Sequence, residues 1–83
     1  LIALDLFCGA GGATRGYQLA GFYVVGVDIQ QQPHYCGEEF YQSDAFEFVA
    51  AHGHEFDLIH ARRRANDTRN VPRENIAKGT LIS

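Results

Sequence analysis

The sequence Asp-Leu-Phe-Cys-Gly-Ala-Gly-Gly occupies residues 5–12. With the apolar residues before it, this stretch predicts a buried parallel strand over residues 1–7 that ends in a tight glycine turn. The next residues place Ala13, Tyr17 and Ala20 at positions i, i+4 and i+7. That spacing predicts a short helix over residues 13–20, which Gly21 ends.

A second apolar run, Phe-Tyr-Val-Val-Gly-Val, fills residues 22–27 and is followed by Asp28. It predicts a second strand, because β-branched and aromatic residues favour strands. A strand, a glycine loop, a helix and a strand in fewer than thirty residues form a βαβ unit with a right-handed crossover.

The pattern beyond Asp28 is weaker but continues the alternation of strand and helix. Pro33 is a candidate first residue of a helix, and residues 40–42 predict a short third strand. Ser43 or Asp44 then suits the N-cap of a helix over residues 45–51, which Gly53 ends. Residues 56–61 predict a fourth strand. We therefore expect an α/β fold with four parallel strands in the order 3-2-1-4 and helices on both faces.

The glycine loop and two acids suggest a ligand site at the carboxyl ends of the strands. Glycine permits positive φ and close approach of a ligand, and the following helix offers free N–H groups at its N-terminus. Asp28 ends the second strand, where an acid commonly binds ribose hydroxyls, and Asp44 is placed to accept from an adenine amino group. Each feature also has a structural interpretation: a plain turn, a solvated strand-end acid and a helix cap.

The loop does not match the common nucleotide-binding motifs. A dinucleotide fold prefers Gly-x-Gly-x-x-Gly, and Thr14 occupies the position of its third glycine counted from Gly9. No Gly-Lys-Ser/Thr follows, so the loop is not that of P-loop NTPases.

Residues 5–12 closely resemble the first motif of the DNA (cytosine-5) methyltransferases, D-L-F-x-G-x-G-G. Val27-Asp28 and Ser43-Asp44-Ala45 resemble the second and third motifs, in the same order and spacing over residues 1–61. The resemblance implies a partial Rossmann-like class I methyltransferase fold that binds S-adenosylmethionine, with Asp28 on the ribose, Ile29 on the adenine and Asp44 on its amino group. The expected cofactor-binding residues are Phe7, Gly9, Ala10, Gly11, Gly12, Asp28, Ile29, Asp44 and Ala45.

The family's nucleophile is a cysteine in Pro-Cys-Gln after the fourth strand, which attacks C6 of a flipped cytosine. Residues 62–66 read Arg-Arg-Arg-Ala-Asn instead, and neither Cys8 nor Cys36 is placed to substitute. By resemblance the function is methyl transfer to C5 of cytosine in double-stranded DNA, and we expect an N-terminal enzyme fragment that does not turn over alone, with no catalytic residue in the chain. The alternatives are a non-catalytic cofactor-binding module, one subunit of a split enzyme completed by another polypeptide, and a methyltransferase with another substrate.

Charge divides the chain at residue 61. Residues 1–61 carry eight acids against one base, giving −7, and residues 62–83 carry six bases against two acids, giving +4. We expect residues 1–61 to be a cofactor-binding half-domain and 62–83 a basic, disordered or non-native tail. The arginines also suit a patch that contacts nucleic-acid phosphates.

We hypothesise that one lost base produced this tail from a parent sequence containing Ser-Pro-Pro-Cys-Gln. Ser-Pro-Pro-Cys-Gln-Arg-Tyr-Ser can be written TCG CCG CCG TGC CAA CGA TAC TCG. Without the first T, the frame encodes Arg-Arg-Arg-Ala-Asn-Asp-Thr-Arg, which is residues 62–69. The hypothesis predicts that the shifted frame of the gene after codon 61 encodes Ser-Pro-Pro-Cys-Gln.

Length and composition limit the classes of protein to which the chain can belong. The chain has 83 residues and is 46% hydrophobic, so it forms at most one small domain. No apolar run approaches the roughly 20 residues that span a bilayer, and two cysteines without metal-site spacing favour a cytoplasmic protein with reduced thiols and no metal. Because the family's later strands do not follow, we expect an unpaired sheet edge, marginal stability and aggregation.

Overall fold

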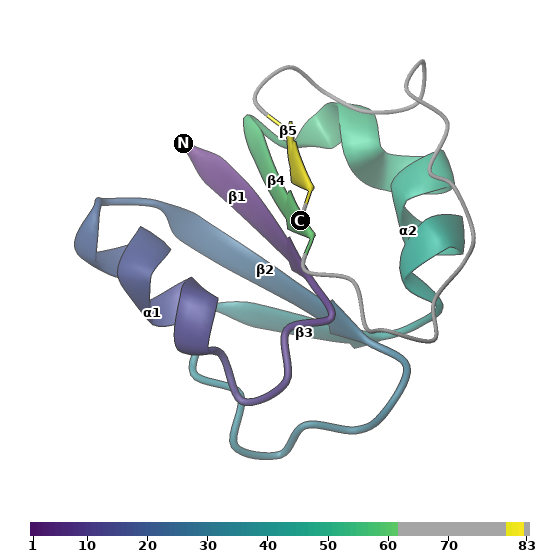
Figure 1. The fold of residues 1–83 in the computed structure, drawn as a ribbon, viewed down its shortest axis with the longest axis horizontal. Coiled ribbons are helices and arrows are strands. Elements are labelled where there is room, and N and C mark those ends of the chain that lie inside the picture. The colour runs from purple at the N-terminus through teal and green to yellow at the C-terminus, as the bar shows by residue number, and fades with distance from the viewer. Residues whose placement is uncertain (62–79, 83) are drawn as a thin grey trace.

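A computed structural model describes residues 1–61 and 80–82 and shows a parallel sheet between two helices (Figure 1). The sheet order is β3-β2-β1-β4-β5, and every neighbouring pair is parallel. The predicted α/β class and the order 3-2-1-4 of the first four strands are therefore confirmed. The elements are β1 (Ile2–Leu6), α1 (Gly12–Leu19), β2 (Tyr23–Asp28), β3 (Glu39–Gln42), α2 (Ala45–His52), the 3-10 helix η1 (Gly53–Glu55), β4 (Leu58–Ala61) and β5 (Thr80–Ile82).

The fifth strand was not predicted. Thr80–Ile82 pairs with β4, with Ile59 opposite Thr80, so the expectation of an unpaired edge at β4 is wrong. Three residues show no usable period, and the pairing joins segments about twenty positions apart, so the sequence carries no local signal for it. The predictions for the rest of the tail, including the arginines at 62–64, fall on residues 62–79 and 83, outside the described residues.

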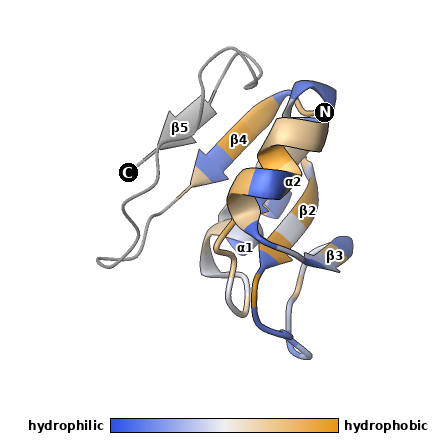
Figure 2. Ribbon diagram, turned by 90° about the vertical axis from the view of Figure 1, so that its right-hand side faces the viewer, coloured by the Kyte–Doolittle hydropathy of each residue, from blue (hydrophilic) through white to orange (hydrophobic). Residues whose placement is uncertain are grey.

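The two faces of the sheet are packed differently. α2 covers an apolar face, on which Leu4, Val25 and Ile59 stand side by side in register and pack with Val49 of α2 and with Phe56. Figure 2 shows α2 across the sheet, with apolar segments in β2 and β4. Successive side chains of a strand point to opposite faces, so the residues between these core positions face α1. Asp5, between Leu4 and Leu6, is one of them.

Most element boundaries agree with the sequence pattern to within two residues, and one prediction fails. The backbone from Pro33 to Glu38 makes turns, including a bond from Tyr35 N–H to the Gln32 carbonyl, and forms no helix. Gly53 caps α2 as predicted, and the chain continues as η1. Within the described residues, no helix has the length and apolar character needed to cross a membrane.

Candidate functional site

The loop after β1 has an unusual backbone. Phe7, Gly9 and Gly11 have φ of 58°, 55° and 105°, all in the left-handed region. Phe7 adopts this conformation against the steric preference of an L residue, whereas the two glycines do so without a Cβ penalty. The Cys8 N–H donates to the Val27 carbonyl at 3.2 Å and the Gly11 N–H to the Cys8 carbonyl at 3.0 Å, so the turn is fixed against β2.

Asp28 connects the ends of three strands. Its carboxylate accepts from the Gly9 N–H at 3.1 Å and from the Gln30 N–H at 3.1 Å. Its carbonyl accepts from the Ser43 N–H at 3.0 Å, directly after β3. The structure therefore brings the glycine loop, Asp28 and the Ser43-Asp44 corner together at one edge of the sheet. Asp28 is only 1% exposed, so its carboxylate lies behind the loop rather than on the open edge.

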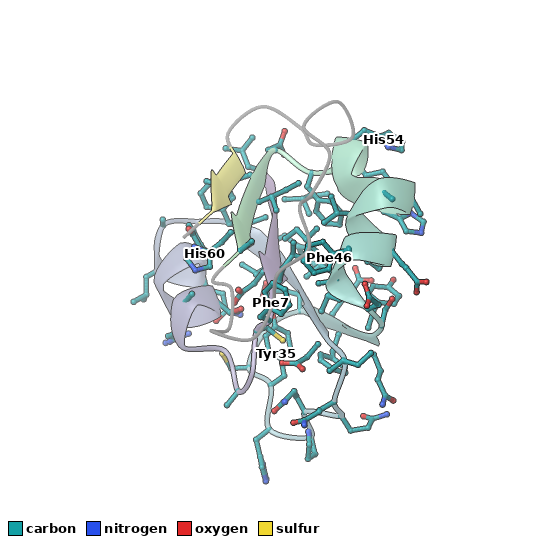
Figure 3. All side chains as sticks on the ribbon, turned by 45° about the vertical axis from the view of Figure 1, so that its right-hand side comes forward. Phe7, Tyr35, Phe46, His54 and His60 are labelled. Carbon is teal, nitrogen blue, oxygen red and sulfur yellow. The ribbon has the colours of Figure 1, made fainter. Side chains whose placement is uncertain are left out.

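Asp44 caps α2, as one of its two interpretations predicted. Its Oδ1 accepts from the Phe46 N–H at 2.9 Å and the Glu47 N–H at 3.1 Å. The two residues after the cap join the interior, because Ala45 is buried and Phe46 packs edge-on against Phe7 with 6.1 Å between ring centroids (Figure 3). Phe7 therefore links the loop after β1 to the first turn of α2.

The remaining predicted residues lie on the solvent-exposed side of the glycine loop and of the end of β2. Ala10 and Gly12 are exposed, and Ile29 exposes 57% of its surface although it is a large apolar residue. α1 begins after Gly11 without a side-chain cap. The predicted site thus divides into buried residues that hold the loop and exposed residues that a ligand can reach.

A polar network beneath the loop was not predicted. The Thr14 hydroxyl donates to Asp5 Oδ2 at 2.6 Å and lies 2.9 Å from the Tyr35 hydroxyl. Since the one Thr14 proton goes to Asp5, the Tyr35 hydroxyl donates to Thr14. Burial raises the pKa of Asp5, while the Thr14 bond acts in the opposite direction.

The Tyr35 ring fits this network because three positions around it are glycines. A Cβ at Gly26 or Gly37 would collide with the ring, and one at Gly11 would lie 3.2 Å from it. The Cys36 N–H donates to the Ala10 carbonyl at 3.2 Å, so the segment after β2 is fastened to the glycine loop. A glycine within the apolar run of β2 was the only sequence signal for this packing.

The two cysteines differ in environment, and both are free thiols. Cys8 is buried, and its burial, followed by the nearby Asp5 and Asp28 charges, raises its pKa to about 12. Cys36 is exposed, and its Sγ donates to the Gly11 carbonyl at 3.3 Å. Cys8 is therefore a protonated structural thiol rather than a nucleophile.

The residues of this edge fit the adenosyl part of S-adenosylmethionine in most respects. The start of α1 offers backbone donors, and the exposed Ile29 offers an apolar contact. Asp28 fits less simply, because its carboxylate holds Gly9 and reaches a ribose only if the loop shifts. No group of three potential metal ligands occurs in the part of the chain that the structure describes. No known family model, curated protein or solved structure matches this chain.

Proposed function

We propose that residues 1–61 bind S-adenosylmethionine at the carboxyl ends of the parallel strands, as the cofactor-binding part of a DNA (cytosine-5) methyltransferase. The observation that carries the proposal is the junction at Asp28, which joins Gly9 through its carboxylate and Ser43 through its carbonyl. In an open parallel sheet, ligands bind outside the carboxyl ends of the strands, where these three corners meet. The first-motif resemblance of residues 5–12 specifies the cofactor.

Each part of the edge has a role in this proposal. The N-terminus of α1 suits the carboxylate of the methionine moiety. Ile29 covers one face of the adenine, and Asp44 accepts from its amino group through the carboxylate that also caps α2. The bound cofactor supplies an electrophilic methyl group, and the chain's own residues orient it.

The described residues do not supply the nucleophile of cytosine methylation. Cys8 has a pKa of about 12 and is buried behind the loop. Cys36 is bonded to the Gly11 carbonyl on the α1 side, away from the end of β4. This favours the second candidate function, a cofactor-binding module or one subunit of a split enzyme, in which another polypeptide contributes the cysteine.

Calorimetric titration of the 83-residue chain with S-adenosylhomocysteine tests the proposal. We expect one site per chain. Ile29→Ala weakens binding about tenfold, since removing roughly 1.4 kcal/mol of apolar contact changes Kd by that factor. The matched control is Leu19→Ala, which removes another exposed apolar side chain, 75% exposed, from the far end of α1 and changes Kd less than about twofold.

Asp28→Ala weakens binding more than Ile29→Ala does, because it releases the Gly9 N–H and so loosens the glycine loop that shapes the site. Absence of binding to the folded chain, or equal Kd values for the parent chain and both site variants, contradicts the proposal. Far-UV circular dichroism of each variant separates a loss of binding from a loss of fold.

A further inference from the structure

A cavity lies on the α2 face of the sheet, at the opposite end of the strands from the glycine loop. Its volume is about 310 Å³, within the range of small-ligand sites. Ile2 and Tyr23, which begin β1 and β2, line it, whereas Asp28 ends β2 about 16 Å away at the usual rise per residue. Figure 3 shows His54, in the same 3-10 helix as the lining residue Glu55, near the top of the molecule, above Phe7 and Tyr35.

Aromatic rings form most of the cavity wall. Phe48 is the central ring, with centroids 5.3 Å from Tyr41, 4.9 Å from His52 and 6.2 Å from Phe56. Tyr23 contributes a further ring from β2. Tyr23 and Tyr41 are 42% and 45% exposed, so their rings are accessible from solvent.

A carboxylate is held between the two tyrosines. The Tyr23 hydroxyl donates to Glu39 Oε2 at 2.6 Å, and the Tyr41 hydroxyl donates to Glu39 Oε1 at 2.8 Å. These two bonds, with that from Tyr23 the stronger, lower the pKa of Glu39 and keep it ionised. A second carboxylate, Glu55, lines the cavity from η1 and is bonded to His52 at 2.8 Å.

Among the described residues, no lysine or arginine lines this cavity. Arg15 is the one such residue between positions 1 and 61, and it belongs to α1, on the other face of the sheet. Glu39 therefore makes no ion pair with any described residue. A fixed anion beside accessible aromatic faces is complementary to a cation, because the ring faces are themselves negative.

We propose that this cavity binds an organic cation, an alkylated ammonium or a guanidinium group, against the tyrosine rings and the Glu39 carboxylate. The site is separate from the proposed cofactor edge and does not depend on it. The cation can belong to a small molecule or to a lysine or arginine side chain of another protein, because both present the same chemistry.

Titration of the 83-residue chain by two-dimensional NMR tests the site with probes of each kind. Choline is compared with its neutral carbon isostere 3,3-dimethylbutan-1-ol, and N-acetyl-arginine amide with N-acetyl-citrulline amide. We expect at least one cation to bind about fivefold more tightly than its neutral partner, a ratio within the range of cation–π interactions. The pair with the larger preference identifies the source of the cation. A preference for choline indicates a small molecule, and a preference for the arginine derivative indicates a protein side chain.

Two variants locate the binding. Glu39→Gln removes the cation preference and leaves binding of the neutral isostere within about twofold. Glu47→Gln removes one negative charge from the exposed side of α2, outside the cavity, and leaves the preference intact. Equal binding of each cation and its isostere, no binding of any probe, or an equal loss in both variants overturns the proposal. Titration of both variants with S-adenosylhomocysteine shows whether the carboxyl edge is unaffected.

Discussion

The two ends of the sheet bind, in our proposals, by different means. At the carboxyl end the chain uses backbone groups: positive φ at Gly9 and Gly11, N–H groups, and a strand end fixed through Asp28. At the amino end it uses side chains from β1, β2, β3, α2 and η1, which meet only in the folded state. The glycine loop is specified by consecutive residues and can be read from the sequence, whereas a side-chain site assembled from five elements cannot.

The largest effect on stability should follow from adding one methyl group to the loop after β1, at the carboxyl ends of the strands. Gly11→Ala places a Cβ at φ 105°, 2.7 Å from Cys36 Sγ and 3.2 Å from the Tyr35 ring. We expect a loss of about 3 kcal/mol in the free energy of unfolding, from left-handed strain and overpacking together. Urea denaturation measures it.

Gly9→Ala is the matched control, because nothing lies within 4 Å of its Cβ and only the backbone strain at φ 55° remains. We expect a loss of about 1 kcal/mol. Equal losses in the two variants would mean that Tyr35 and Cys36 do not pack on Gly11.

The buried Asp5 should make the carboxyl end sensitive to pH. Its pKa is raised by burial, so between the ordinary value of 3.8 and the folded value the native state holds more protons than the unfolded state. Stability contributed by protonated Asp5 is present below this window and is lost as pH rises through it.

Asp5→Asn keeps an acceptor for the Thr14 hydroxyl and removes the titration. We therefore expect the stability of the variant relative to the parent chain to increase as pH rises from 4 to 8. Urea denaturation at a series of pH values measures this difference. A difference that is constant with pH would show that Asp5 ionises normally in the folded chain.

A smaller effect is expected at the amino end. Tyr23→Phe removes the stronger of two hydroxyl bonds to Glu39, so the pKa of Glu39 should rise towards its ordinary value. NMR titration of the Glu39 carboxyl carbon measures the shift. Tyr17→Phe removes a tyrosine hydroxyl bonded to His60 on the α1 face and should leave the Glu39 pKa unchanged. The same Glu39 pKa in the parent chain and in Tyr23→Phe would exclude the Tyr23 hydroxyl as a cause of the lowered pKa.

Chemical labelling of the two cysteines is the test that should disturb the fold least. At pH 8, iodoacetamide should modify exposed Cys36 at least about a hundredfold faster than Cys8, whose pKa is about 12. Mass spectrometry should show one rapid adduct in the parent chain and none in Cys36→Ser. Rapid labelling of Cys8 in the native chain would indicate that the loop after β1 opens readily.

Local patterns explain which parts of this molecule could be predicted. Apolar runs specified β1 and β2, and the glycines at 9, 11 and 12 marked the turn between β1 and α1. Asp44 was recognised as a cap because the Asx N-cap is a local motif.

The parts that were missed depend on contacts between distant residues. Tyr35 fills the space left by Gly26, Asp28 binds the loop rather than standing at the open edge, and β5 joins β4 across a long separation. The cavity around Glu39 was missed for the same reason: its lining residues come from segments between Ile2 and Phe56 that meet only in the folded chain.

The most direct test of the central claim is an amide NMR titration of the 83-residue chain with S-adenosylhomocysteine. We predict that the largest shifts occur at Gly9, Ile29 and Ser43, at the carboxyl ends of β1, β2 and β3, and that Tyr23 and Glu55 at the amino end do not move. Shifts concentrated at Tyr23 and Glu55, or no shifts at saturating concentration, would contradict an adenosine site at the glycine loop.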